Sequence, residues 1–189
     1  MQTDYISYIR YWIEENFSDD KSRHIFGVCE TAKSLARHYN ADENKAEVAA
    51  LFHDMFKDIT DEELKDYAKN LGLEEKYQNN INLAHSKIAA AIMASDYNIS
   101  DEDILNAVKY HTTGRVGMSL LEKIIFIADV IEPGRDYPGV EEVRELVYKD
   151  LAEACLTAMK NSVEYVRAKG NFIDEDTLEA IDWFKSAFD

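Results

Sequence analysis

Apolar residues recur every three or four positions along most of this 189-residue chain, which is the period of an α-helix with one buried face. Near the start of the chain, one such stripe comprises Tyr5, Tyr8, Ile9, Trp12 and Ile13. No segment alternates apolar and polar residues as a half-buried strand would, and glycines and prolines are scarce. We therefore predict an all-α protein in which residues 1–189 form a single domain.

The same pattern places the individual helices. Helices are predicted over residues 4–17, 22–38, 42–52, 84–97, 101–110, 141–167 with a break, and 175–188. Two more begin at Thr60-Asp-Glu-Glu63 and Ser119-Leu-Leu-Glu122, because both match the capping box, in which a hydroxyl and a carboxylate bind free amides of the first turn. Segment 132–139 contains both prolines and must end the second of these helices. We expect a core over about 20–135, with C-terminal helices over about 141–188 packed on it.

Charge limits the classes of partner. The chain has 21 Lys and Arg against 37 Asp and Glu, and its net charge of −16 repels polynucleotides and anionic lipid surfaces. No stretch approaches the ~18 consecutive apolar residues of a membrane span, and the N-terminus shows no secretory signal. We expect a cytoplasmic protein without nucleic-acid or membrane partners. A small phosphate-bearing molecule stays compatible, since bound cations can reverse the field inside one cleft, and a homodimer is compatible with the sequence.

The two cysteines carry no sign of metal chemistry. Cys29 and Cys155 fall among apolar helical positions and form no CxxC pattern. We expect buried free thiols rather than metal ligands or a disulfide.

Histidines are the first candidates for chemistry. The chain has five, and His38 lies in an exposed-looking Arg-His-Tyr-Asn sequence, so we interpret it as a surface residue. The other four lie near predicted helix ends or turns: His24, His53, His85 and His111. The pair His53-Asp54 is the sharpest signal, because it ends the apolar run 48–52 and projects an imidazole and a carboxylate from a buried helix. A carboxylate can bridge two ions through its two oxygens, as dinuclear hydrolytic sites require.

Asp129 is an independent indication of a metal site. Inside an apolar helix its carboxylate would be buried without a partner, at a cost of several kcal/mol. A metal ion is the natural partner, and an ion pair with an arginine such as Arg23 is the alternative. Each gap between successive candidates is long enough for a helix and its connection, so five consecutive helices could point ligands at one centre. The predicted metal ligands are His24, His53, Asp54, His85, His111 and Asp129. All are nitrogen or oxygen donors, which suit Fe, Mn, Zn, Ni or Co.

Basic residues near these ligands are candidate phosphate contacts. Lys57 lies three residues after Asp54 and could meet a phosphate or the leaving oxygen, although a solvated lysine at the carbonyl end of a helix is equally compatible. Arg135 follows Pro133 on the returning loop and could clamp a phosphate through two hydrogen bonds, or it could be a surface arginine.

Small residues beside the ligands have two interpretations as well. Thr112 and Thr113 follow His111 and offer donors close to a metal, although a plain turn would use the same residues. Gly27 lies one turn after His24 and costs its helix about 1 kcal/mol relative to alanine. This glycine could let a nucleotide approach closely, or it could allow helix packing.

The order of the six predicted ligands resembles the HD superfamily of metal-dependent phosphohydrolases. Three phrases are similar to the YqeK group within it: Tyr110-His-Thr-Thr-Gly-Arg115, Ala128-Asp-Val-Ile-Glu-Pro-Gly-Arg135 and Lys169-Gly-Asn-Phe-Ile-Asp-Glu-Asp-Thr177. The resemblance spans about residues 20–183. It implies an HD-type helical bundle with a metal site at converging helix ends, and a di-iron centre held by all six positions. It also implies symmetrical hydrolysis of diadenosine tetraphosphate to two ADP.

On this resemblance a metal-activated water attacks phosphorus, and Asp54, Lys57 and Asp129 are the catalytic residues. Arg115 and Ile173, which lie in the matching phrases, join the candidate substrate contacts. Many members carry histidine and proline where this chain has Ile-Asp-Glu at 173–175. Two other functions share the same ligands: an HD nucleotidase or phosphodiesterase for another phosphate ester, and a non-catalytic regulatory module that binds metal or nucleotide.

Overall fold

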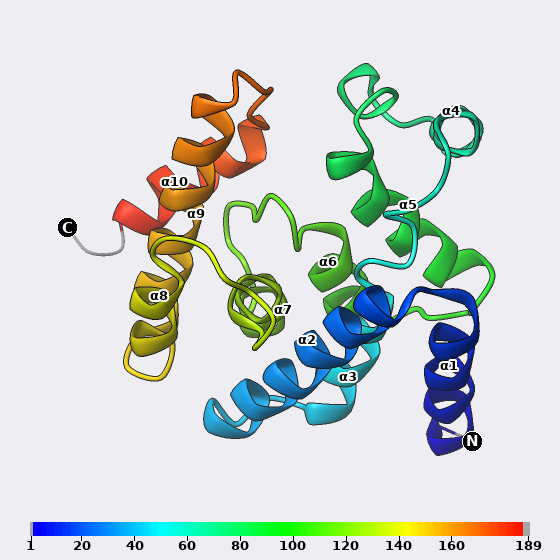
Figure 1. The fold of residues 1–189 in the computed structure, drawn as a ribbon, viewed down its shortest axis with the longest axis horizontal. Helices are drawn as coiled ribbons and strands as arrows, with labels where there is room; N and C mark the ends of the chain where they lie inside the picture. Colours follow the sequence, from blue (N-terminus) through cyan, green and yellow to red (C-terminus); the bar gives the residue numbers. More distant parts are fainter. Residues whose placement is uncertain (1, 187–189) are drawn as a thin grey trace.

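The structure is a computed structural model that describes residues 2–186, with side chains from residue 6 onward. Over these residues it contains helices and no strand, which confirms the all-α prediction (Figure 1). The elements are α1 (Gln2–Asn16), α2 (Asp19–His38), α3 (Glu43–Phe52), α4 (Asp61–Asn70), the 3-10 helix η1 (Glu75–Tyr77), α5 (Ile81–Ser95), α6 (Glu102–Lys109), α7 (Leu120–Ile131), α8 (Val140–Leu146), α9 (Leu151–Ala168) and α10 (Glu175–Ser186).

Local capping explains where most helices begin. Both predicted capping boxes are present, at Thr60 for α4 and at Ser119 for α7. α2 begins three residues before its predicted start, because the Ser18 hydroxyl accepts a hydrogen bond from the Lys21 amide. α5 also begins three residues early, without a side-chain cap from Asn80. The predicted end of the last helix, at residue 188, lies outside the described residues.

The predicted break in segment 141–167 is confirmed. It separates α8 from α9, and Asp150 caps α9 through the amides of Ala152 and Glu153. The three-residue helix η1 was not predicted, since one turn is too short to show a periodic pattern. The proline-containing segment ends α7 at Ile131 as predicted.

The apolar stripe of α1 is narrower than predicted. Ile9 and Ile13 are buried and Trp12 is half-buried. Tyr8, however, is 58% exposed because it lies on the flank of the buried face. The side chain of Tyr5 lies outside the described residues.

α7 is the central helix of the bundle. It packs against α2 and α3 on one side, α6 on another, and α9 and α8 on a third (Figure 1). α5 lies against α6 and α4, and α10 packs on α9. A small second core lies under α4 and η1. This arrangement directs the start of α2, the end of α3, the start of α5 and the end of α6 towards the C-terminal half of α7.

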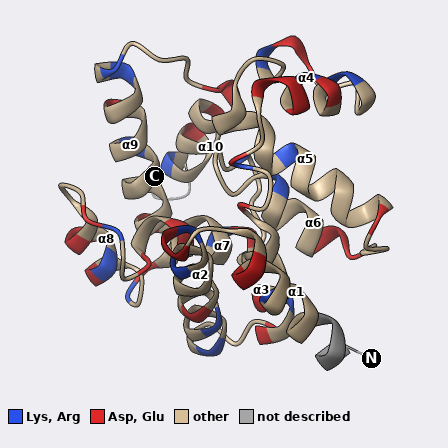
Figure 2. Cartoon of the chain, turned by 45° about the vertical axis from the view of Figure 1, so that its right-hand side comes forward, with Lys and Arg blue, Asp and Glu red and all other residues tan. Residues whose placement is uncertain are grey.

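Charged side chains cover the outer helices. Figure 2 shows acidic and basic residues interspersed on α2, α4 and α8, whereas α5 is largely free of charge. Both cysteines are buried free thiols, as predicted. None of the described helices is long and apolar enough to cross a lipid bilayer.

Candidate metal centre

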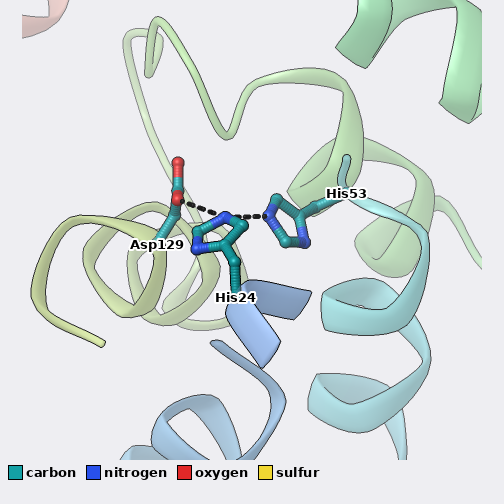
Figure 3. Close-up of side chains that lie close together, drawn as sticks. All are labelled: His24, His53 and Asp129. Carbon is teal, nitrogen blue, oxygen red and sulfur yellow. Dashed lines mark hydrogen bonds and ion pairs between the residues drawn. The ribbon is translucent and has the colours of Figure 1, made fainter. Parts of the chain in front are cut away.

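The structure brings all six predicted ligands to one centre. Their positions are His24 on α2, His53 at the end of α3, Asp54 in the turn that follows, His85 on α5, His111 in the turn after α6 and Asp129 on α7. The five helices are not consecutive, because α4 and η1 lie between α3 and α5 and contribute no ligand. Figure 3 shows the His24 ring between the Asp129 carboxylate and the His53 ring. Ligand atoms of His24, His53 and Asp129 lie within 4.8 Å of one another, as do those of His53, Asp54 and His111.

Asp54 lies between two pairs of histidines. Its Oδ1 is 3.1 Å from His85 Nε2 and 3.7 Å from His111 Nε2. Its Oδ2 is 3.7 Å from His24 Nε2 and 4.0 Å from His53 Nε2. The two oxygens of one carboxylate therefore face different ligand pairs, which is the geometry that a bridging carboxylate needs.

The hydrogen-bond partner of each Nδ1 atom shows which nitrogen of the histidine ring carries the hydrogen. The Nδ1 atoms of His53, His85 and His111 lie 2.6, 2.8 and 2.8 Å from carbonyl oxygens of their own helices. A carbonyl only accepts, so each Nδ1 carries a hydrogen and donates it. Burial lowers the pKa of His53 to about 3 and that of His85 to about 4, which keeps both rings neutral. Their Nε2 lone pairs then point at the centre, as in metal-binding histidines.

Hydrogen-bond acceptor atoms of the histidine rings and of Asp54 therefore face one another at the centre. The Nε2 atom of His85 lies 3.1 Å from that of His111 and 3.1 Å from Asp54 Oδ1. Asp54 Oδ1 is buried and accepts no hydrogen bond within the described structure. Such an arrangement is repulsive by itself and becomes favourable around cations, so the residues fit divalent metal ions.

His24 is oriented by a carboxylate instead of a carbonyl. Its Nδ1 lies 3.2 Å from Glu132 Oε1, and the buried Glu132 also accepts a hydrogen bond from the Gly134 amide at 2.6 Å. A Cβ on Gly27 would lie 2.8 Å from Glu132 Oε2. Gly27 thus makes room for this carboxylate, which favours the packing interpretation over close approach of a nucleotide. Glu132 was missed as a partner of a ligand, although it is the first residue of the predicted loop 132–139 and directly precedes Pro133.

Asp129 has an arginine partner, as the alternative interpretation expected, but this partner is Arg135 and not Arg23. Arg135 Nη2 contacts Asp129 Oδ1, and Arg135 Nε donates to the Asp129 carbonyl at 2.7 Å. The proposed alternative partner, Arg23, instead pairs with Asp20 on the surface at 2.6 Å. The premise that the Asp129 carboxylate lacks a protein partner was therefore wrong, because the loop after α7 folds back onto the helix.

Both neighbours of Asp129 favour its charged form. Burial alone would raise the pKa of Asp129, but a hydrogen bond with His24 and the charge of Arg135 hold it well below its ordinary value. His24 Nε2 lies 3.2 Å from Asp129 Oδ1. The carboxylate is therefore in the ionised form that binds a metal.

Two lysines flank Asp54. Lys57 Nζ is 3.8 Å from Oδ1, with its side chain 33% exposed, as a residue at the rim of the centre should be. Lys21 Nζ is 3.2 Å from Oδ2 and 3.4 Å from Asp58 Oδ2, and its side chain is 11% exposed. Lys21 was missed in the sequence. Its position one turn before His24 on the same face of α2 is the signal that could have found it.

The remaining candidates make structural contacts. Thr113 is buried and donates to the Gly114 carbonyl at 2.9 Å, while the Thr112 hydroxyl lies 3.4 Å from that of Ser86. Arg115 donates to both carboxylate oxygens of Glu122, at 2.7 and 2.6 Å, and so braces the start of α7. Ile173 packs against the main core. Contacts of these four residues with a substrate stay predictions.

Comparison with known proteins identifies the family of this chain. The HD domain family matches residues 22–134, so the chain belongs to the HD domain family. A crystal structure of an HD superfamily hydrolase from Clostridium acetobutylicum, described as involved in NAD metabolism, is 39% identical. It superposes with a TM-score of 0.90 over 96% of this chain and 97% of that one.

Two similar curated proteins share one name, which specifies an activity within this family. The chain is 38% identical to the symmetrical bis(5′-nucleosyl)-tetraphosphatase of Bacillus subtilis, over 92% of this chain and 94% of the relative. It is 40% identical to the protein of the same name from Halalkalibacterium halodurans, over 88% and 89% of the two chains. The resemblance seen in the sequence is therefore confirmed.

Proposed function

We propose that this protein hydrolyses diadenosine tetraphosphate symmetrically, to two ADP, at a dinuclear metal centre. The observation that carries the proposal is the placement of Asp54, whose two oxygens face separate pairs of histidines. The names of the curated relatives support the substrate and the symmetry of cleavage.

Each half of the centre would hold one ion. His24, His53 and Asp129 would bind the first, His85 and His111 the second, and Asp54 both. When bound, the ions supply a water deprotonated near neutral pH and neutralise charge that grows on the phosphoryl oxygens. Iron is our proposal for the metal on family resemblance, and Mn, Zn, Ni or Co suit the same donors.

Cationic side chains would position the polyphosphate. Lys21 and Lys57 lie on opposite oxygens of Asp54, and Arg135 lies on Asp129. Three cations at one site attract an anionic substrate to a chain whose net charge is −16. Catalysis would then rest on positioning and electrostatic stabilisation, without a nucleophilic side chain.

The C-terminal helices contribute to the support of the centre. α9 packs on α7, which carries Asp129, and α8 packs on both helices. We propose that they belong to the same domain as the residues matched to the HD family, with a small nucleotide as the partner of that domain.

Metal analysis and product identification test the proposal together. Protein purified without oxygen should contain two metal ions per chain and release ADP as the only nucleotide product of diadenosine tetraphosphate. Release of ATP and AMP would contradict symmetrical cleavage. Faster release of inorganic phosphate from a mononucleotide would favour the nucleotidase alternative, and metal binding without turnover of any phosphate ester would favour a regulatory module.

A further inference from the structure

α5 carries a single Asp, Glu, Lys or Arg, and this residue is buried. Lys87 is 6% exposed, in a helix that is otherwise almost uncharged (Figure 2). It follows the ligand His85 by two residues, so the two side chains leave α5 about 200° apart. Lys87 therefore lies on the opposite side of α5 from the metal centre.

The Lys87 ammonium binds the end of α6. Its Nζ donates to the Lys109 carbonyl at 3.0 Å and lies 4.2 Å from the centroid of the Tyr110 ring. Its nearest carboxylate oxygen, on Asp176, is 3.8 Å away. The strongest contact of Lys87 is thus with the backbone two residues before the ligand His111.

The two halves of the centre are supported differently. His24 is oriented from another helix end by Glu132, and Asp129 by Arg135. His53 is oriented by a carbonyl of its own helix, as are His85 and His111. The second half thus has no ligand of its own that a described side chain of another element orients. The separation of the Nε2 atoms of His85 and His111 therefore depends on how α5 is held against α6. Apolar residues of α5 and α6 also pack in the same core. Among the described residues other than the ligands, the polar side-chain contacts between α5 and the end of α6 are those of Lys87 with the Lys109 carbonyl and, at a longer distance, of Ser86 with Thr112.

We infer that Lys87 is a positioning residue that locks α5 to the end of α6 and so sets the spacing of His85 and His111 for the second metal ion. This inference rests on the proposed dinuclear centre. It assigns Lys87 no contact with metal or substrate.

The stability of the fold does not by itself explain a lysine at position 87. Burial of an ammonium is costly, and Asp176, whose carboxylate oxygen is the nearest among the described residues, lies beyond hydrogen-bond distance. An apolar side chain of similar length would pack without this cost. Lys87 and Tyr110 also line a pocket of 470 Å³ whose walls come from α5, α6, the segment 71–77 and Asp176, which leaves room for a larger cation at position 87.

Titration of the metal-free protein with Mn²⁺, followed by electron paramagnetic resonance, tests the inference. Lys87→Met should keep the first site and bind the second ion about 10–100-fold more weakly, the range of outer-shell changes. The spectrum of a coupled pair should then appear only at higher Mn²⁺, and the melting temperature of the metal-free protein should not fall. Lys87→Arg should retain the pair, because a guanidinium can also donate to the Lys109 carbonyl.

Lys109→Met is the matched control. It removes an exposed cation 5.3 Å from the same Tyr110 ring without breaking the link between the helices, so both ions should bind normally. Unchanged second-ion affinity in Lys87→Met would overturn the inference, and so would equal weakening of both ions. If Lys87→Met does not fold, Lys87→Leu, which also lacks a donor, replaces it with the same criteria. The titration needs no substrate, so a protein that binds two ions and hydrolyses nothing would refute the proposed function alone.

Discussion

Asp54 Oδ1 lies 3.1 Å from His85 Nε2, and both atoms are hydrogen-bond acceptors. The hydrogen of the ring is on Nδ1, which donates to the Ile81 carbonyl at 2.8 Å. This contact costs free energy in the metal-free protein and becomes favourable when a cation lies between the two atoms. Stability and metal binding therefore make opposite demands on Asp54.

Asp54→Asn and Asp54→Ala should separate these demands. An asparagine amide can donate to an imidazole Nε2, so metal-free Asp54→Asn should melt at the same or a higher temperature than the unsubstituted protein. Activity should fall at least about a hundredfold in both variants, since outer-shell changes already cost 10–100-fold. Calorimetry and metal analysis check the two effects. Near-normal turnover by either variant would refute the bridging role.

Glu132 should control the first metal ion through His24. Glu132→Gln keeps the shape but weakens the charge that orients the ring, and metal affinity should fall about 10–100-fold. Glu141→Gln is the control, because Glu141 is an exposed partner of Arg144 and should leave metal affinity unchanged.

Gly27→Ala distinguishes packing against Glu132 from contact with a nucleotide. The new Cβ would lie 2.8 Å from Glu132 Oε2, so activity should fall even though alanine favours the helix by about 1 kcal/mol. The loss should be smaller in a Glu132→Ala background, which lacks the carboxylate that the new Cβ would meet, than in the unsubstituted protein. Equal losses in both backgrounds, with a raised KM, would indicate a nucleotide contact.

The lysines beside Asp54 should act on the substrate. Lys21→Met and Lys57→Met should each raise the KM for diadenosine tetraphosphate roughly tenfold, which corresponds to one charge-assisted contact. Metal content should stay at the level of the unsubstituted protein. Lys65→Met, which changes an exposed lysine of α4, is the control. A loss of metal without a change in KM would instead show that these lysines support Asp54.

Cys29 should make stability depend on alkaline pH. Burial raises the pKa of the Cys29 thiol to about 11, against the opposing charge of Arg10. As pH rises from about 9 to 11, the unfolded chain loses a thiol proton that the folded chain keeps, so stability falls. Cys29→Ala should reduce this fall in denaturant titrations. Thiol reagents at pH 8 should label Cys29 and Cys155 only after unfolding, and rapid labelling of the folded protein would contradict their burial.

Much of the fold is encoded locally. The capping boxes at Thr60 and Ser119 and the periodicity of apolar residues act within one or two turns, and these helices appear where the sequence predicts them. Features of a single turn are too short to show a periodic pattern, as η1 and the early start of α2 illustrate. The sequence also indicated the six ligand candidates, His53-Asp54 and Asp129 from the residues themselves and His24, His85 and His111 mainly from their order and the family resemblance.

The partners of these residues were decided by tertiary structure. Arg135 on Asp129, Glu132 on His24, Lys21 on Asp54 and Lys87 on the Lys109 carbonyl all depend on loops and helices that meet only after packing. A side chain can contact only groups that lie within a few ångströms. The angles at which the helices cross decide which groups lie that close. The sequence by itself determined which atoms could bind a metal. Only the packing of α2, α3, α5, α6 and α7 decided that Asp54 would lie between two pairs of histidines and which residues would hold them there.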